Sequence, residues 1–205
     1  MIITDPEQIE RRSMELIESE LTARIPEENK AVVKRVIHCT ADFDYEKNLA
    51  FSDRAVEKGL AALRSGCAIV TDTNMARSGI NTAAAARLGC EVHCFMSDPD
   101  VAKTAKARGC TRAAVSMEKA AAMEKDLIIA VGNAPTALLR LCELIDEKKI
   151  SPKLVIGVPV GFVNIIESKN EIMERDVPFI IAKGRKGGSN VAAAIVNALM
   201  YQITR

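Results

Sequence analysis

His38, one of two histidines in the chain, stands in the segment RVIHCTADFDY among groups that could assist an imidazole. Apolar residues recur at helix spacing just before it, at Val32, Val33, Val36 and Ile37. His38 is therefore expected at the C-terminal end of a helix that Pro26 begins. The negative end of that helix dipole, together with Asp42 and Asp44, would favour a protonated imidazole. From spacing alone, a structural histidine and a proton donor both remain open.

A second group of candidates lies in four turns that lead into helix N-termini: TDTNMARSG, GNAPTAL, GVPVGFVN and KGRKGGSN. Helix N-termini present free N–H groups and suit anions, and glycine lets backbone approach a ligand closely. The last turn adds Lys183, Arg185 and Lys186 to the glycines, although a solvated basic loop would have the same composition. The residues expected to contact an anionic ligand are Asn133, Thr136, Arg185, Gly187, Gly188 and Ser189.

Three further patterns carry weaker signals. Ser13 lies in the first predicted helix, and from the sequence alone we expect it to be a surface residue. Arg112 opens a predicted helix, where its charge opposes the dipole, which slightly favours a ligand role. The segment CEVHC could supply metal ligands, but strand alternation would place His93 and Cys94 on opposite faces, so we expect no metal site.

The elements that must position these residues alternate along the chain. Five apolar strand candidates, at 67–72, 91–96, 127–132, 154–160 and 178–184, are separated by helical segments. This order predicts one α/β domain over residues 1–205, with a mostly parallel five-stranded sheet and helices on both faces. Residues 1–65 are expected to be helical and to pack on an α/β core at 66–205. Asp5 with Pro6, Ser52 and Gly66 are the expected helix boundary residues. Ligands of such sheets bind outside the carboxyl ends of the strands, where the candidate turns lie.

Composition excludes several classes of protein. The net charge of +1 at pH 7 is too small for a large nucleic-acid footprint. No apolar run is long enough to span a membrane, and the N-terminus is too polar for a signal peptide. The six cysteines show no C-x-x-C spacing and are expected to be reduced thiols. We therefore expect a cytoplasmic protein without nucleic-acid or membrane partners.

Taken in series, RVIHCTADFDY, TDTNMARSGI, GNAPTALLRL, GVPVGFVNIIESK and GRKGGSNVAAAIVNAL resemble the precorrin-8X methylmutase family of cobalamin biosynthesis. The resemblance covers about residues 13–199. It implies a parallel α/β homodimer that needs no cofactor, with a corrinoid partner, precorrin-8 or cobalt-precorrin-8. It also implies an isomerase that moves a methyl group from C-11 to C-12 and yields hydrogenobyrinate or cobyrinate. The segment TADFDY is more like the branch of the family that acts on cobalt-containing substrate.

The resemblance assigns the catalytic histidine to His38, and substrate contacts to Ser13 and Arg112. An imidazolium at His38 would donate a proton or strong hydrogen bond to a ring nitrogen near C-11. Two other functions stay open: a tetrapyrrole carrier without catalysis, and an enzyme that binds a phosphate ligand through KGRKGGSN. The second is disfavoured because the chain lacks both the Walker A loop and a G-x-G-x-x-G turn after a strand.

Overall fold

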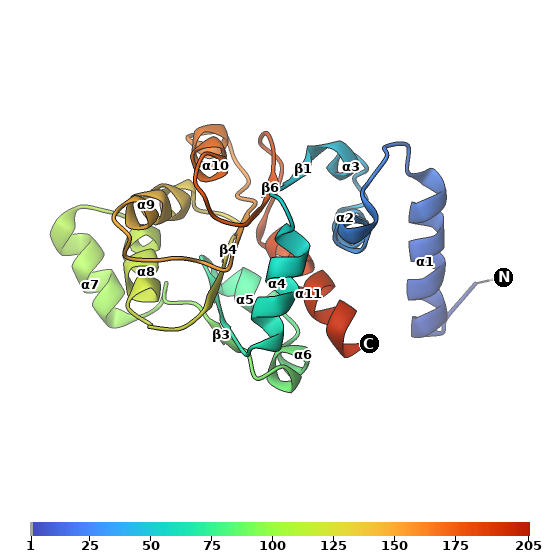
Figure 1. Cartoon of the computed structure of the whole chain (residues 1–205), viewed down its shortest axis with the longest axis horizontal. Coiled ribbons are helices and arrows are strands. Elements are labelled where there is room, and N and C mark those ends of the chain that lie inside the picture. The colour runs from blue at the N-terminus through green and yellow to red at the C-terminus, as the bar shows by residue number, and fades with distance from the viewer. Residues whose placement is uncertain (1) are drawn as a thin grey trace.

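A six-stranded sheet runs through the middle of the computed structural model, which describes residues 2–205. The strands lie in the order β1-β6-β5-β4-β2-β3, and all neighbours are parallel except β1, which is antiparallel to β6. Their bounds are β1 Leu49–Phe51, β2 Ala68–Thr71, β3 Glu91–His93, β4 Leu127–Val131, β5 Leu154–Gly157 and β6 Phe179–Ala182. The predicted mostly parallel α/β fold is therefore confirmed (Figure 1).

Helices cover both faces of the sheet (Figure 1). Their bounds are α1 Pro6–Glu20, α2 Glu27–Thr40, α3 Tyr45–Asn48, α4 Ala55–Arg64, α5 Asn74–Gly79, α6 Thr82–Arg87, α7 Pro99–Arg108, α8 Arg112–Ala121, α9 Pro135–Asp146, α10 Ile165–Met173 and α11 Ser189–Thr204. Alternate strand residues enter two separate cores. In β4, for example, Ile128 packs with α2, α4 and α11, whereas Ile129 packs with α8, α9 and α10.

The number of strands corrects the prediction of five. The sixth strand, β1, lies within the N-terminal region that was expected to be helical, and it pairs Ala50 with Ile181. Its three residues lie half-buried at the edge of the sheet, and three residues are too few to show a periodic pattern in the sequence. The prediction that Ser52 caps the next helix is also wrong. Its hydroxyl accepts the N–H of Phe179 at 2.9 Å, and α4 starts after Arg54.

Other predicted boundaries are confirmed. The Asp5 side chain accepts the N–H of Gln8 at 2.8 Å, and Pro6 is the first residue of α1. Gly66 follows α4 with φ +76°, a conformation that glycine adopts at helix ends. The five predicted strands all form, but β3 and β5 end three residues earlier than expected, at His93 and Gly157.

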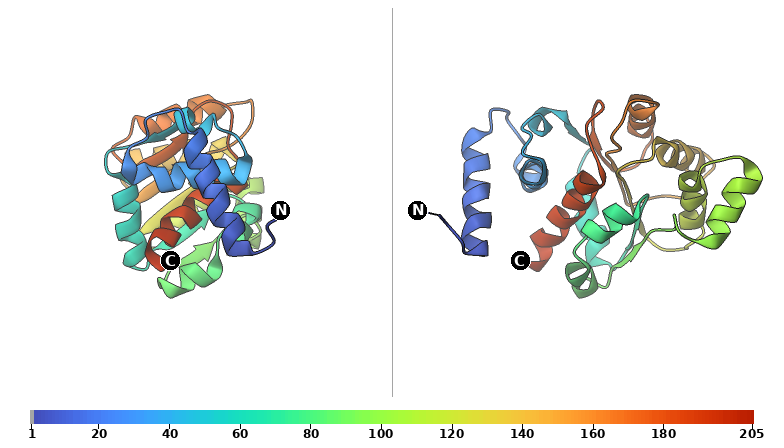
Figure 2. Two further views of the ribbon diagram at one scale, coloured as in Figure 1. Left: turned by 90° about the vertical axis from the view of Figure 1, so that its right-hand side faces the viewer. Right: turned by 180° about the vertical axis from the view of Figure 1, so that it is seen from behind.

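The N-terminal helices sit on one end of the molecule. Helix α2 packs against α11, and α1 lies on the outer side of α2, as both views in Figure 2 show. Helices α7 and α8 lie at the opposite end. Within residues 2–205, no helix is both long and apolar enough to cross a membrane.

Candidate functional site

The carboxyl ends of the parallel strands meet the loop that connects β6 to α11. At the end of β4, a Cβ on Gly132 would lie 2.7 Å from the Cα of Ser189, so the two backbones touch. At the end of β5, the carbonyl of Val158 accepts the N–H of Gly188 at 2.8 Å. The end of β2 also reaches this loop, because the hydroxyls of Thr73 and Ser189 are 2.8 Å apart. Three strand ends and one helix start therefore form a single edge.

The buried carboxylate of Asp72 holds the turn after β4. Its oxygens accept the backbone N–H groups of Gly132, Asn133 and Ala134 at 2.7–2.8 Å. Burial raises the pKa of Asp72, and the three backbone N–H bonds partly oppose that rise by favouring the carboxylate. Sequence reasoning missed this residue. The available signal was an acidic residue directly after a strand that is apolar throughout.

Glycine is required in the loop between β6 and α11, which also contains Arg185 and Lys186. Gly187 has φ +155°, and a Cβ there would lie 2.1 Å from the carbonyl oxygen of Val158. Gly188 has φ +137°. These conformations let the loop lie directly on the turn after β5, where the Arg185 carbonyl accepts the N–H of Gly161 at 3.2 Å. The side chain of Ser189 faces inward to Thr73 and is nearly buried.

His38 occupies the last turn of α2, as predicted, and its side chain is exposed. The next residue, Cys39, donates through Sγ to the carbonyl oxygen of Asn190 at 3.9 Å. The C-terminal end of α2 thus lies beside the first turn of α11. Among residues 2–205, no side chain or backbone group is hydrogen-bonded to the imidazole of His38.

The two carboxylates that were expected to support His38 bind another partner. Asp42 and Asp44 both accept from the Nζ of Lys186, at 2.5 and 2.6 Å. These hydrogen bonds raise the pKa of Lys186, and the bond from Lys186 lowers the pKa of Asp42. The ion pairs join the segment after α2 to the loop before α11. Within residues 2–205, the other two cations of this loop, Arg185 and Lys183, form no ion pair.

Two other predicted residues, Arg112 and Thr136, start neighbouring helices. The hydroxyl of Thr111 caps α8, accepting the N–H of Ala114, and donates to the hydroxyl of Thr136 at 2.9 Å. Arg112 is exposed at the start of α8, and Thr136 lies in the first turn of α9. Because α9 follows the Asp72-bound turn directly, Thr136 and Asn133 belong to the same edge as the loop before α11. Asn133 has an exposed side chain there.

Ser13 lies elsewhere. Its hydroxyl donates to the carbonyl oxygen of Ile9 at 2.7 Å within α1, and it is partly exposed. Helix α1 and the start of α8 belong to opposite ends of the molecule (Figure 1). Within a single chain, the predicted residues of α9 and of the loop before α11 therefore lie together, and the end of α2 lies beside them. Ser13 does not lie near Arg112.

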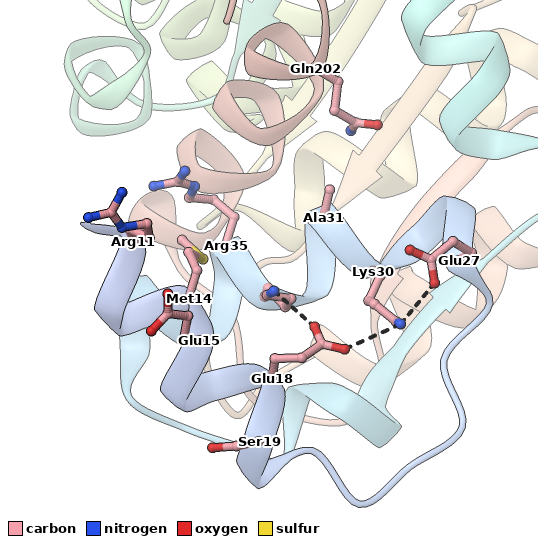
Figure 3. Close-up of a pocket in the computed structure, with 11 residues that line it drawn as sticks. Arg11, Met14, Glu15, Glu18, Ser19, Glu27, Lys30, Ala31, Arg35 and Gln202 are labelled. Carbon is pink, nitrogen blue, oxygen red and sulfur yellow. Dashed lines mark ion pairs between the residues drawn. The ribbon is translucent and has the colours of Figure 1, made fainter. Parts of the chain in front are cut away.

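A hollow of about 950 Å³ lies in a different part of the molecule. It lies between α1 and α2, and Figure 3 shows that Glu18 and Glu27 both point to Lys30 within it. None of the predicted site residues lines this hollow. Its lysines are paired with its own glutamates, Lys34 with Glu18 included. The sheet edge remains the candidate site, because unpaired polar groups converge there.

Comparison with known proteins shows the family to which the chain belongs. The family model described as precorrin-8X methylmutase matches residues 8–202. A cobalt-precorrin-8 methylmutase of Salmonella typhimurium is 45% identical, over 98% of this chain and 97% of that protein. A precorrin-8X methylmutase of Pseudomonas aeruginosa is 39% identical, with 96% of each chain covered. The crystal structure of a precorrin-8X methylmutase from Thermus thermophilus superposes with a TM-score of 0.89 at 39% identity, covering 95% of each chain.

Proposed function

The chain belongs to the precorrin-8X methylmutase family, and we propose that it moves the methyl group on C-11 of a precorrin-8 macrocycle to C-12. As a methylmutase it is an isomerase of cobalamin biosynthesis. The products would be hydrogenobyrinate or, with cobalt in the ring, cobyrinate. The observation that carries this proposal is the single edge at which the Asp72-bound turn, the loop before α11 and the end of α2 meet.

The substrate class suits that edge. A corrinoid precursor bears several carboxylates around a broad apolar ring, so it needs several separate anion contacts. The edge offers the guanidinium of Arg185 and polar groups at the starts of α9 and α11. Helix N-termini favour negative charge, so these contacts can bind different carboxylates of one ring. Arg112 would contact the part of the ring nearest α9.

His38 is the residue we assign to proton donation. Its imidazole is exposed and unpaired among residues 2–205, next to the first turn of α11, so a bound ring could reach it. A proton or strong hydrogen bond given to a ring nitrogen near C-11 would draw electron density from the migrating centre. General acid catalysis of this kind contributes roughly 10²–10⁴-fold in rate. The remaining acceleration would come from holding the ring in a reactive geometry.

Cobalt-precorrin-8 is the substrate we favour. The relative from Salmonella typhimurium that carries this name is 45% identical, whereas the precorrin-8X methylmutase of Pseudomonas aeruginosa is 39% identical. The sequence TADFDY after His38 points the same way. The reaction is an isomerisation and calls for no added redox cofactor.

A homodimer in the cytoplasm is part of the proposal. Large apolar side chains are exposed near α1 (Ile2, Ile3, Ile9 and Leu16), after β5 (Val160, Phe162, Val163 and Ile166) and, singly, at Met75 in α5. Contiguous exposed apolar surface is typical of protein interfaces. Because α1 lies away from the sheet edge, Ser13 could take part in substrate binding only where a second copy brings α1 to a site.

The test is an anaerobic conversion assay with precorrin-8 and cobalt-precorrin-8, followed by absorbance. We expect wild-type protein and the matched His93→Ala variant to form the corrin chromophore. His38→Ala should bind product normally and turn over roughly 10²–10⁴-fold more slowly. Near-normal turnover by His38→Ala would disprove the proton-donor role. Tight binding by wild type without conversion would instead indicate a tetrapyrrole carrier.

A further inference from the structure

Lys169, in α10, is fully buried, with 1% of its surface exposed. Its Nζ donates to two backbone carbonyl oxygens, of Gly184 at 2.8 Å and of Lys186 at 2.9 Å. No carboxylate of residues 2–205 forms an ion pair with it. Buried lysines are normally paired with an acid, because desolvating an ammonium is costly. Lys169 thus binds only the backbone of the loop before α11.

These two contacts fix the direction of the peptide groups in the loop. In a planar trans peptide the carbonyl of one residue and the N–H of the next point in opposite directions. The carbonyls of Gly184 and Lys186 point inward to Lys169, so the N–H groups of Arg185 and Gly187 point outward. Within residues 2–205, neither N–H donates to an acceptor. Free backbone N–H groups in a loop of this kind can donate to a bound anion.

We propose that Lys169 is a positioning residue, whose buried ammonium holds residues 184–188 so that the N–H groups of Arg185 and Gly187 stay free to donate to substrate carboxylate. This inference rests on the proposed function and deepens it, because it assigns one carboxylate subsite and the residue that shapes it. Arg185 is exposed in the same loop, with its Cζ 5.5 Å from the ring centroid of Phe162. Lys169 does not touch substrate, since the loop lies between them.

The first test compares Lys169→Met with Lys153→Met, which removes an exposed lysine that pairs with Asp126 near the start of β5. We expect Lys169→Met to bind hydrogenobyrinate about tenfold more weakly and to show a matching rise in KM. Its kcat should stay within about threefold of wild type, because His38 is unchanged. Lys153→Met should match wild type in all three quantities. A residue with a merely structural role would not separate KM from kcat.

A second measurement needs no variant and therefore holds if Lys169→Met fails to fold. In ¹⁵N-labelled wild-type protein, titration with hydrogenobyrinate should shift the amide signals of Arg185 and Gly187 downfield. The amide of Gly109, which lies after α7, should not move.

The outcomes separate the two proposals. If wild type converts substrate but these two amides stay unmoved, or Lys169→Met keeps wild-type affinity, the role of Lys169 is wrong and the proposed function stands. If wild type neither binds nor converts a corrinoid, both proposals are wrong.

Discussion

The carboxylate of Asp72 accepts the backbone N–H of Asn133 at 2.8 Å, so the residue directly after β2 fixes the turn that follows β4. The neighbouring N–H groups of Gly132 and Ala134 bind the same carboxylate. The turn that begins α9 therefore depends on a side chain 60 residues earlier in the sequence. Strand β2 and strand β4 are parallel neighbours, which brings the two together.

Replacing Asp72 with Asn should destabilise the protein. An amide NH₂ would face backbone donors that now meet a carboxylate oxygen, and hydrogen bonds to a buried charge would be lost. We expect the free energy of unfolding to fall by about 2–4 kcal/mol. Urea titration would measure this, with the exposed Asp176→Asn as the control, for which we expect less than about 0.5 kcal/mol. An unchanged midpoint of urea unfolding for Asp72→Asn would show that the turn after β4 does not depend on the Asp72 carboxylate.

Two of the three cations in the loop before α11, Arg185 and Lys186, should differ in their effect on product affinity. Lys186 is already neutralised by Asp42 and Asp44, whereas Arg185 rests over the ring of Phe162, with its Cζ 5.5 Å from the ring centroid. Arg185→Ala should weaken product binding about tenfold, or roughly 1.4 kcal/mol. Lys186→Met should weaken the free energy of product binding by less than about 1 kcal/mol, because the ion pairs of Lys186 are partly exposed.

Titrations at low and high salt would check both expectations for these cations. The loss caused by Arg185→Ala should shrink as salt rises, since added ions screen an exposed charge. If Lys186→Met lost more product affinity than Arg185→Ala, Lys186 and not Arg185 would be the cation that binds the product.

Gly187→Ala should disturb the loop by more than backbone strain alone. The new Cβ would lie 2.1 Å from the carbonyl oxygen of Val158, so the loop must move away from β5. Gly109→Ala is the matched control, because Gly109 also has positive φ, at +62°, but a Cβ there meets nothing within 4 Å. We expect about 1 kcal/mol of destabilisation for the control and about 2–4 kcal/mol for Gly187→Ala. Equal losses of unfolding free energy for the two variants in chemical unfolding would contradict the close contact between Gly187 and the Val158 carbonyl.

Lys169 should make stability depend on pH in the alkaline range. Burial lowers the pKa of Lys169 to about 8, from 10.5 for an ordinary lysine. Between these values the unfolded chain binds more protons than the folded one, so the contribution of Lys169 to stability rises with pH. Below about pH 8 both states are protonated, and this dependence disappears.

The comparison of wild type with Lys169→Met isolates that effect, because all other titrating groups are common to both. The difference between their free energies of unfolding should grow in favour of wild type by roughly 2 kcal/mol from pH 7.5 to pH 9.5. A difference that stays constant over this range would mean that Lys169 keeps an ordinary pKa in the folded protein.

Local sequence was sufficient for the framework of the site. The four central strands could be predicted because each is an apolar run that is largely buried, such as Leu127–Val131, whereas β3 at the edge has the exposed Glu91 and a half-buried His93. Asp5 and Gly66 could be predicted as boundary residues because capping depends on neighbours a few positions away. The location of the candidate site could also be predicted from the order of strands and helices, since ligands bind at the carboxyl ends of parallel strands.

The tertiary structure decided which side chains meet at that edge. Sequence proximity suggested that Asp42 and Asp44 support His38, but the fold brings Lys186 to them from 142 or more positions away. Strand β1 is a strand only because β6 lies beside it. Asp72 and Lys169 look ordinary in the sequence, because the backbone groups that satisfy them are distant along the chain. Local preferences fix helices, strands and caps, whereas the partner of a buried charge depends on distances that only the folded chain defines.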